Sequence, residues 1–371
     1  MKKVVVASDS FKGCLSSAQV ADAVAEGVHE VFPECEVVKL SVADGGEGTM
    51  DALMSALAGE SRKVTVNDPL GRPVDASYVL INGNTAVIEM ASASGITLLE
   101  HDERNPMLTS TYGTGELIAD ALDKGCRRFL ICLGGSATND AGMGMLQALG
   151  YRFMGAEGQA LNPCGESLVK VVSIQAKDVN PALKESEFIV ACDVDSPFCG
   201  PEGAAYVYGP QKGATLEMIN KLDKGMRQFA VLVESVTGID PTDIPGAGAA
   251  GGLGGALIAF MNARLCRGAD MVLDAVAFDR AIGDADLIIT GEGRIDSQTA
   301  TGKLPYAVAK RSSGIPVLGI CGRAEVDSLP CFRKIVQVSP TDMPLSKAMN
   351  AIVAAENVRK AIMDILLLES L

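Results

Sequence analysis

Residues 287–296 read Leu-Ile-Ile-Thr-Gly-Glu-Gly-Arg-Ile-Asp, a strand-like apolar run that breaks into glycine and charged residues. Near the amino terminus, Val4-Val5-Val6 leads in the same way into Asp9-Ser10-Phe11-Lys12-Gly13. An α/β protein binds its ligand where loops of this kind lie, at the carboxyl ends of its parallel strands. We therefore expect the two ends of the chain to contribute strands to one parallel sheet.

The alternation of strands and helices is interrupted once along the chain. Strand-like and helix-like segments alternate up to about residue 57, and again from residue 286 to the carboxyl terminus. Between them, residues 62–91 read as consecutive strands, the last two joined by Asn82-Gly83-Asn84. An Asn-Gly turn between strand-like runs is a strong hairpin signal. Consecutive antiparallel strands indicate a second architecture and a domain boundary near residue 65.

The fold class that we predict is α/β, with two domains. A Rossmann-like parallel-sheet domain is built from both chain ends, residues 1–65 and 285–371, and a second α/β domain with antiparallel strands, residues 66–284, is inserted into it. A chain of 371 residues agrees with this division, because it is longer than one hydrophobic core usually grows. The active site is expected in the cleft between the domains, where ligand sites commonly lie.

Composition argues against several classes of protein. The chain has 32 basic and 46 acidic residues, and its formal charge of −14 disfavours binding to nucleic acid or to anionic lipid. No apolar run reaches the roughly 18 residues of a membrane span. Met1-Lys2-Lys3 leads directly into a short strand, without the pattern of a secretory signal. We expect a cytoplasmic protein with no nucleic-acid or membrane partner.

Two further glycine loops follow strand-like segments. In Asp44-Gly45-Gly46-Glu47-Gly48-Thr49, the glycines let the backbone approach a ligand, and the carboxylates offer the hard oxygen ligands that suit Mg²⁺. Gly134-Gly135-Ser136 supplies consecutive N–H donors of the kind that cradle a phosphate. Any one such loop is explained equally well as a capped turn. Four of them in one chain favour an enzyme that handles a phosphorylated or carboxylated small molecule.

Several charged residues next to these loops have two readings each. Asp193 and Asp195 follow a strand two residues apart, a spacing that suits metal binding or a catalytic base, but also paired turn acids before Pro197. The guanidinium of Arg294 can hold a carboxylate or phosphate at two points, or can pair with a neighbouring acid. Lys212 is a weaker cationic candidate.

Two familiar nucleotide motifs are not supported. Residues 246–251 match G-x-G-x-x-G, but the preceding segment contains two prolines and cannot be the central strand that the dinucleotide fingerprint requires. This disfavours a nicotinamide oxidoreductase. The chain also lacks the P-loop motif G-x-x-x-x-G-K-[ST], so if it is a kinase, it is not a P-loop kinase.

Taken together and in order, these motifs resemble those of the type I glycerate kinases of bacteria. The resemblance includes Gly113-Thr114-Gly115-Glu116 and runs nearly the full length of the chain. It implies transfer of the γ-phosphate of ATP to D-glycerate, with Mg²⁺, and most members of the family in bacteria are glycerate 2-kinases that make 2-phosphoglycerate. A glycerate 3-kinase and a non-catalytic organic-acid-binding protein remain as alternatives. A homodimer is also expected.

The resulting hypothesis assigns a role to each candidate residue. Lys12 and Asp193 are the catalytic residues, with Asp193 as the base that accepts the hydroxyl proton. The sequence leaves open which loop binds ATP and which binds glycerate. The expected sets are Ser10, Arg294, Gly45 and Gly46 for substrate, Gly134, Gly135, Ser136 and Lys212 for nucleotide, and Asp44, Glu47 and Asp193 for Mg²⁺.

Overall fold

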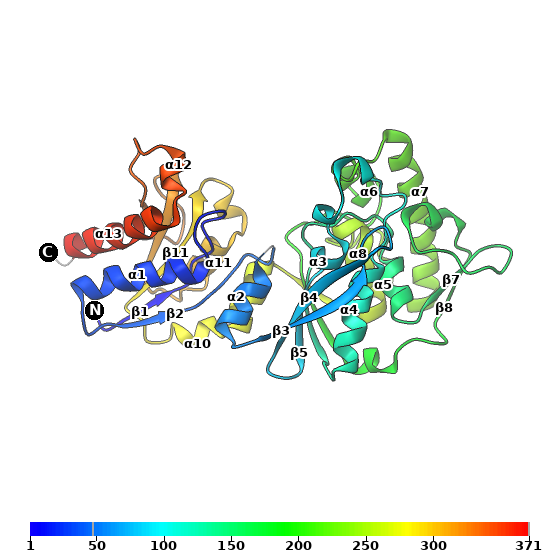
Figure 1. The fold of residues 1–371 in the computed structure, drawn as a ribbon, viewed down its shortest axis with the longest axis horizontal. Helices are drawn as coiled ribbons and strands as arrows, with labels where there is room; N and C mark the ends of the chain where they lie inside the picture. Colours follow the sequence, from blue (N-terminus) through cyan, green and yellow to red (C-terminus); the bar gives the residue numbers. More distant parts are fainter. Residues whose placement is uncertain (47, 370–371) are drawn as a thin grey trace. The chain divides into compact units, whose positions relative to one another are not determined.

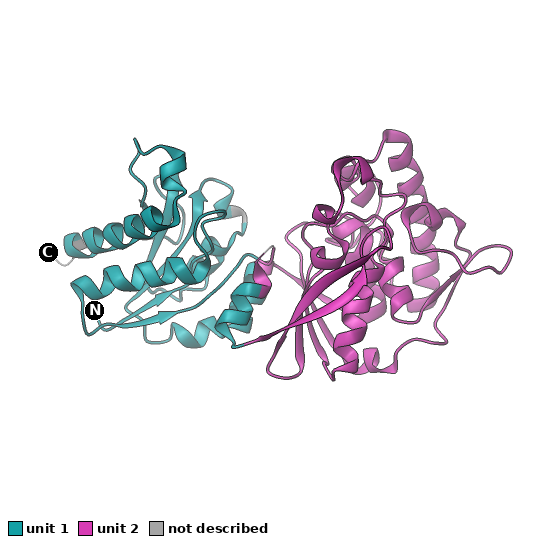
Figure 2. Cartoon of the chain, viewed as in Figure 1, with its two compact units in different colours: residues 1–44, 51–58, 269–371 teal, residues 45–50, 59–268 magenta. Residues whose placement is uncertain are grey.

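The computed structural model describes residues 1–46 and 48–369 of the chain (Figure 1). It divides into two compact units, which Figure 2 shows in different colours. Unit 1 comprises residues 1–44, 51–58 and 269–371, and unit 2 comprises residues 45–50 and 59–268. Among the helices of the described residues, none combines the length and apolar character that a bilayer span requires.

Unit 1 is built on a five-stranded parallel sheet whose strands come from both ends of the chain. Across the sheet the order is β13-β12-β11-β1-β2, which is the flavodoxin-like order of doubly wound folds. Val4 pairs with Leu287 and Val6 with Ile289 in parallel register. The predicted α/β fold, with a parallel sheet formed by both chain ends, is therefore confirmed. The strands are β1 (Lys3–Val6), β2 (Glu36–Lys39), β11 (Leu287–Ile295), β12 (Val317–Ala324) and β13 (Lys334–Gln337).

Helix α1 (Ser17–Val31) packs against the carboxyl-terminal helix α13 (Ala351–Glu369), and the two run side by side in Figure 1. The sequence Ser16-Ser17-Ala18-Gln19 has the pattern of a capping box, and the structure contains one, because Ser16 and Gln19 exchange side-chain and backbone hydrogen bonds at the start of α1. The other helices that lie wholly or mostly in unit 1 are α2 (Thr49–Ala56), α9 (Gly268–Ala275), α10 (Phe278–Ala281), α11 (Leu304–Lys310) and α12 (Leu345–Ala348).

Unit 2 contains a six-stranded mixed sheet with the order β10-β9-β6-β5-β4-β3. Strands β3 (Glu60–Asn67), β4 (Pro73–Ile81) and β5 (Thr85–Glu89) are antiparallel neighbours, and β5 pairs in parallel with β6 (Arg128–Cys132). Asn82 and Gly83 have φ of 53° and 72°, as a tight hairpin turn requires. The predicted hairpin is confirmed. Strands β9 (Glu187–Ala191) and β10 (Arg264–Cys266) complete the parallel part.

The helices of unit 2 surround a large apolar core. Phe129 and Phe188 stack in this core from neighbouring strands, with ring centroids 4.6 Å apart. A small antiparallel pair, β7 (Arg152–Met154) and β8 (Ser173–Gln175), lies outside the main sheet. The helices are α3 (Ala91–Ser94), α4 (Tyr112–Asp123), α5 (Met143–Ala148), α6 (Ala204–Tyr208), α7 (Leu216–Thr237) and α8 (Ala249–Met261).

The glycine-rich segment at the start of α8 serves close packing. Gly251 has φ of 70°, and a Cβ there would lie 2.0 Å from the carbonyl oxygen of Thr138. Gly252 has φ of 93°, and a Cβ there would approach Met226 and Ala141 to within 3.0 Å. Side chains at these positions would force the backbone apart. The G-x-G-x-x-G letters therefore have a packing explanation.

Candidate functional site

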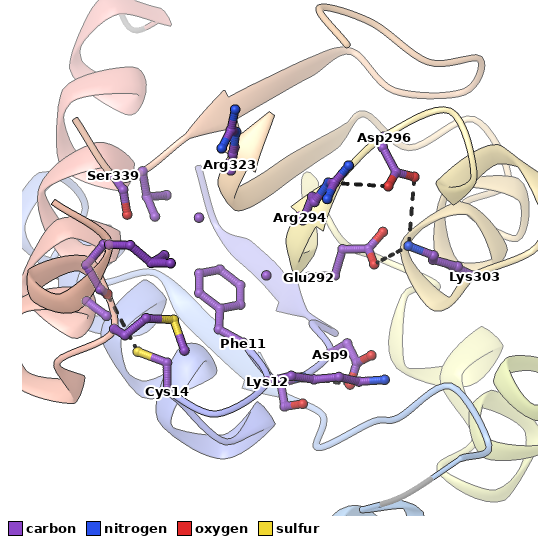
Figure 3. A pocket seen from close by; sticks show the side chains of 18 of the residues that line it. Asp9, Phe11, Lys12, Cys14, Glu292, Arg294, Asp296, Lys303, Arg323 and Ser339 are labelled. Carbon is purple, nitrogen blue, oxygen red and sulfur yellow. Dashed lines mark hydrogen bonds and ion pairs between the residues drawn. The ribbon is translucent and has the colours of Figure 1, made fainter. Parts of the chain in front are cut away.

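A cavity of about 410 Å³ lies in unit 1, at the carboxyl ends of β1, β11 and β12 (Figure 3). The sheet order reverses between β1 and β11, and this switch point is where doubly wound sheets bind ligands. The loop after β1 contributes Asp9, Ser10 and Lys12, and β11 contributes Glu292 and Arg294. We call this cavity the switch-point pocket.

Asp9 and Lys12 form one charged wall of the switch-point pocket together with Asp44. Asp9 is only 7% exposed, and its carboxylate accepts a hydrogen bond of 2.7 Å from the backbone N–H of Ser10. Burial, and secondarily the charge of Asp44, raises the pKa of Asp9 to about 6. Burial disfavours the charged form of Lys12. The negative charges of Asp44, which lies 3.4 Å away, and of Asp9 together favour that form more strongly, so the pKa of Lys12 is raised. Lys12 is therefore a cation at neutral pH.

A second group of charges lines the pocket from β11 and the segment that follows it, and is drawn in Figure 3. Lys303 lies 3.1 Å from a carboxylate oxygen of Glu292, and Thr299 donates a hydrogen bond of 2.6 Å to the other oxygen. Burial raises the pKa of Glu292, although Thr299 and Lys303 oppose the shift. Arg294 pairs with Glu325 at 2.5 Å and lies 3.5 Å from Asp296. Arg294 therefore forms an ion pair with an acid close by, as its structural interpretation expects, and it also lines the pocket.

Taken as a whole, the polar lining of this pocket mixes both signs of charge. Its cations are Lys12, Arg294, Lys303 and Arg323, and its carboxylates are Asp9, Asp44, Glu292 and Asp296. A lining of this kind can hold a polyanion together with a divalent cation, because the cations contact the anion and the carboxylates contact the metal.

A second cavity, of about 380 Å³, lies in unit 2 beyond the carboxyl ends of β6 and β9. We call it the glycine-loop pocket, because Gly45, Gly46, Gly134 and Gly135 line it together with Ser136. Gly45 has φ of 91°, and a Cβ there would lie 2.2 Å from the Cα of Gly268. Only glycine allows these two segments to approach so closely.

Lys212 reaches the glycine-loop pocket from the short helix at residues 210–212 and is only 2% exposed. Its ammonium donates a hydrogen bond of 2.7 Å to the carbonyl oxygen of Thr138. Burial lowers the pKa of Lys212 to about 7, and the charge of Asp140 partly opposes this shift. An anion that entered the pocket would favour the protonated form of Lys212.

Asp140 binds backbone N–H groups at the start of α5. It is fully buried and accepts backbone hydrogen bonds from Gly142 and Gly144 at the start of α5. It also accepts bonds from the backbone and the hydroxyl of Thr111. These partners hold the loop after β6 in place, and with it the glycines and Ser136 of the pocket.

Asp193 lines the glycine-loop pocket and accepts a hydrogen bond of 3.0 Å from the backbone N–H of Gly268. Strand β9 ends at Ala191, so Asp193 and Asp195 follow it, and their two-residue spacing would place them on one side only if the strand continued through both. Asp193 alone remains the candidate base at this pocket.

Comparison with known proteins identifies the family of this chain. The chain matches the sequence profile of the Glycerate kinase family over residues 4–368. It belongs to this family. A "Glycerate kinase" from Bacillus subtilis (strain 168) is 46% identical over 370 residues, 98% of this chain and 96% of the relative. A "Glycerate 2-kinase" from Escherichia coli (strain K12) is 45% identical over 323 residues, 86% of this chain and 85% of the relative.

A solved structure shows the same fold. A crystal structure assigned to glycerate kinase 2 from Salmonella typhimurium LT2 has a TM-score of 0.92 and 43% sequence identity, and the match covers 100% of this chain and 98% of that one. The resemblance read from the motifs is therefore confirmed at the level of the family, and with it the enzyme class.

The two pockets of this glycerate kinase family member divide the expected site residues between the two units. The expected substrate set is split, because Ser10 and Arg294 line one pocket whereas Gly45 and Gly46 line the other. Glu47 lies outside the described residues. Lys12 and Asp44 are in the switch-point pocket, and the expected nucleotide residues Gly134, Gly135, Ser136 and Lys212 are together in the glycine-loop pocket with Asp193.

Sequence reasoning missed one wall of the switch-point pocket entirely. Arg323 and Ser339 line it, as do apolar side chains from residues 338–354. Arg323 follows a strand-like run and Gly322, so the glycine and charge after that strand could have indicated it. The other residues stand in no such motif, and they reach the pocket through the sheet order, which makes β12 the neighbour of β11 and carries the segment after β13 to the pocket.

Proposed function

We propose that this protein transfers the γ-phosphate of ATP to the 2-hydroxyl of D-glycerate, giving 2-phosphoglycerate and ADP. The observation that carries the proposal is the mixed-charge pocket at the switch point of unit 1 in a member of the glycerate kinase family. The name of the Escherichia coli relative, a glycerate 2-kinase, supports the position of transfer. A cytoplasmic location and a homodimer stay predictions.

Mg²⁺ fits the switch-point pocket. The charge of Asp44 contributes to the raised pKa of Asp9, so the two carboxylates repel each other, and a divalent cation would relieve that repulsion. Among the described residues no group of three or more histidine, cysteine or acidic side chains could hold a metal. Mg²⁺ in kinases needs only one or two carboxylates besides the phosphates and water. When bound with ATP, it neutralises part of the charge on the β- and γ-phosphates.

Asp44 and Asp9 are therefore the residues that would hold Mg²⁺ in unit 1. Asp193 stays a prediction as a ligand, since it lies in the glycine-loop pocket. Glu47 also stays a prediction.

Lys12 and Arg294 supply positive charge at the polar end of the switch-point pocket. Phosphoryl transfer depends mainly on positioning and on cations placed where charge spreads over the phosphoryl oxygens. The raised pKa of Lys12 keeps its ammonium protonated throughout the neutral range. The guanidinium of Arg294 can offer N–H donors in a planar fork, although Glu325 already engages one of its nitrogens.

Asp193 is the proposed base, and it acts on the acceptor hydroxyl by accepting its proton as the phosphoryl group arrives. Lys212 and Ser136, in the same pocket, offer a cation and a hydroxyl to an anionic ligand. The two pockets allow two distributions of the substrates, with ATP in the glycine-loop pocket and glycerate at Lys12, or the reverse.

Phosphorus NMR of a mixture of the protein, D-glycerate, ATP and Mg²⁺ tests the proposal. We expect the resonance of 2-phosphoglycerate to grow as those of ATP decline. A 3-phosphoglycerate resonance would instead establish a glycerate 3-kinase. Glycerate binding by calorimetry without any phosphoryl transfer would replace the proposal with a non-catalytic organic-acid-binding protein.

A further inference from the structure

The switch-point pocket has two chemically different ends. Its polar end carries the ionic side chains described above, and its other end is apolar. Figure 3 shows the ring of Phe11 within the pocket. The side chains of the apolar end come from the loop after β1 and from the segment that follows β13, and they are Phe11, Val338, Leu345, Ala348 and Met349.

D-Glycerate does not match an apolar end of this kind. It is a small acid in which every carbon carries oxygen, so placing it against apolar side chains would remove water from its polar groups without replacing their hydrogen bonds. A volume of about 410 Å³ is in the range of pockets that take much larger ligands. A ligand that matches the whole pocket combines a flat apolar ring with a charged tail.

The floor of this pocket leaves room for a flat ring. Gly293 on β11 and Gly322 on β12 line the pocket, and the register between them is given by the pairs Glu292 with Cys321 and Arg294 with Arg323. A Cβ on Gly293 would meet Phe11 at 3.6 Å, which is ordinary van der Waals contact, and the φ of Gly293 is not in the left-handed region. Packing within the chain therefore does not require a glycine at 293, whereas a ring lying on the strand would.

We propose that the apolar end of the switch-point pocket binds the purine base of the phosphoryl donor, with the phosphates extending toward Lys12 and Arg294. The inference rests on the proposed function and selects one of its two substrate distributions. The glycine-loop pocket, with Lys212, Ser136 and the base candidate Asp193, is then left for D-glycerate. This reverses the expected assignment of the Gly134 loop to the nucleotide.

Met349→Ala is the central test, with Ile352→Ala as its matched control. Met349 is 41% exposed and lines the pocket, whereas Ile352 is 83% exposed and is not among its lining residues. Loss of one apolar contact predicts a KM for ATP about three- to tenfold higher in Met349→Ala. The KM for D-glycerate stays within about twofold, and Ile352→Ala leaves both values unchanged.

Gly293→Ala gives a second, sterically opposite test. Its methyl group fits the free protein, so the thermal midpoint should stay near that of the wild type while the KM for ATP rises. Unchanged KM values for ATP in both Met349→Ala and Gly293→Ala would overturn the inference, as would a rise confined to the KM for D-glycerate.

Photolabelling with 8-azido-ATP provides a readout independent of turnover. We expect the label in peptides covering residues 338–354, and protection from labelling by ATP but not by D-glycerate. Label in residues 134–140 or 208–212 instead would overturn the inference. Absence of phosphoryl transfer in the wild type would defeat the proposed function alone, because the labelling experiment still reports where the base binds.

Discussion

Lys12 and Lys39 are two solvent-accessible lysines of unit 1 that each pair with an aspartate, but of the two only Lys12 lines the switch-point pocket. Lys12 lies 3.4 Å from Asp44, and Lys39 lies 2.6 Å from Asp22. Exposed ion pairs contribute little to stability, typically about 0 to 1 kcal/mol. Any large effect of replacing Lys12 must therefore come from its place in the switch-point pocket.

We expect Lys12→Met to lower kcat by about 100-fold or more, since one preorganised charge on a transferring group is worth a factor of this size. The thermal midpoint should move by no more than that of Lys39→Met, the matched control, which should retain wild-type turnover. Steady-state kinetics and thermal denaturation of both variants provide the measurement. Turnover like that of the wild type in Lys12→Met would remove its catalytic role.

Lys212 predicts a specific pH dependence of stability. Its pKa is about 7 in the folded protein and 10.5 in the unfolded chain, because burial disfavours the ammonium. Between these values the unfolded state binds more protons, so the free energy of unfolding rises with pH from about 7 to 10.5. Below pH 7 the buried side chain of Lys212 is protonated, so the full cost of burying its charge lowers the free energy of unfolding. The charge of Asp140 is the main compensation for this cost.

Lys212→Met removes this titration. We therefore expect the stability of the variant relative to the wild type to be greatest near pH 6 and to decline steadily toward pH 9.5. Urea denaturation across this range measures it, and Lys221→Met on the exposed face of α7 serves as the control with no such trend. A difference between Lys212→Met and wild type that is the same at every pH would contradict the assigned pKa.

At the level of elements, helices α1 and α13 approach unusually closely at Gly27. A Cβ on Gly27 would lie 2.5 Å from the carbonyl oxygen of Arg359 and 3.0 Å from Ile362. Alanine is normally better than glycine inside a helix by about 1 kcal/mol. Overpacking a tight contact costs about 1 to 3 kcal/mol, so the clash should outweigh the gain in helix propensity.

Gly27→Ala should thus lower the free energy of unfolding by about 1 kcal/mol, measured by urea denaturation. Glu26→Ala, on the exposed side of the same helix, should change it by less than about 0.5 kcal/mol. An increase in stability for Gly27→Ala would show that the two helices do not approach this closely at Gly27.

Some of the structural elements could be predicted from the sequence, and others could not. Local chemistry identified the Asn82-Gly83 hairpin, the Ser16 capping box and the strands that end in glycine loops, because each depends on neighbouring residues alone. The apolar wall from residues 338–354 could not be predicted. Its residues become pocket residues only through the strand order β13-β12-β11-β1-β2, which long-range pairing determines.

The division of the candidate site has a similar cause. Gly45 and Gly46 directly follow Asp44, so the sequence groups all three in one motif. In the structure the boundary between the compact units falls between Asp44 and Gly45. One motif therefore serves two pockets, and its spacing gives no sign of this.

For the whole molecule, the proposed distribution of substrates assigns one ligand to each compact unit. The chain carries a net charge of −14, so both anionic substrates depend on local cations, which include Lys12 and Arg294 in unit 1 and Lys212 in unit 2. Each ligand should accordingly stabilise the loops of its own pocket against local opening. Backbone amide exchange reports such opening segment by segment.

Hydrogen–deuterium exchange of the full chain with one substrate at a time tests this distribution without turnover. ATP without D-glycerate should slow exchange in residues 9–15, 292–296 and 338–349, where the base and phosphates are proposed to bind. D-Glycerate without ATP should slow exchange in residues 134–140, 191–194 and 209–213, because its carboxylate would engage Lys212 and the glycine amides. The antiparallel pair of β7 and β8 contributes no residue to either pocket and serves as the internal control. Protection of the glycine-loop segments by ATP alone would restore the opposite distribution, with the nucleotide in unit 2.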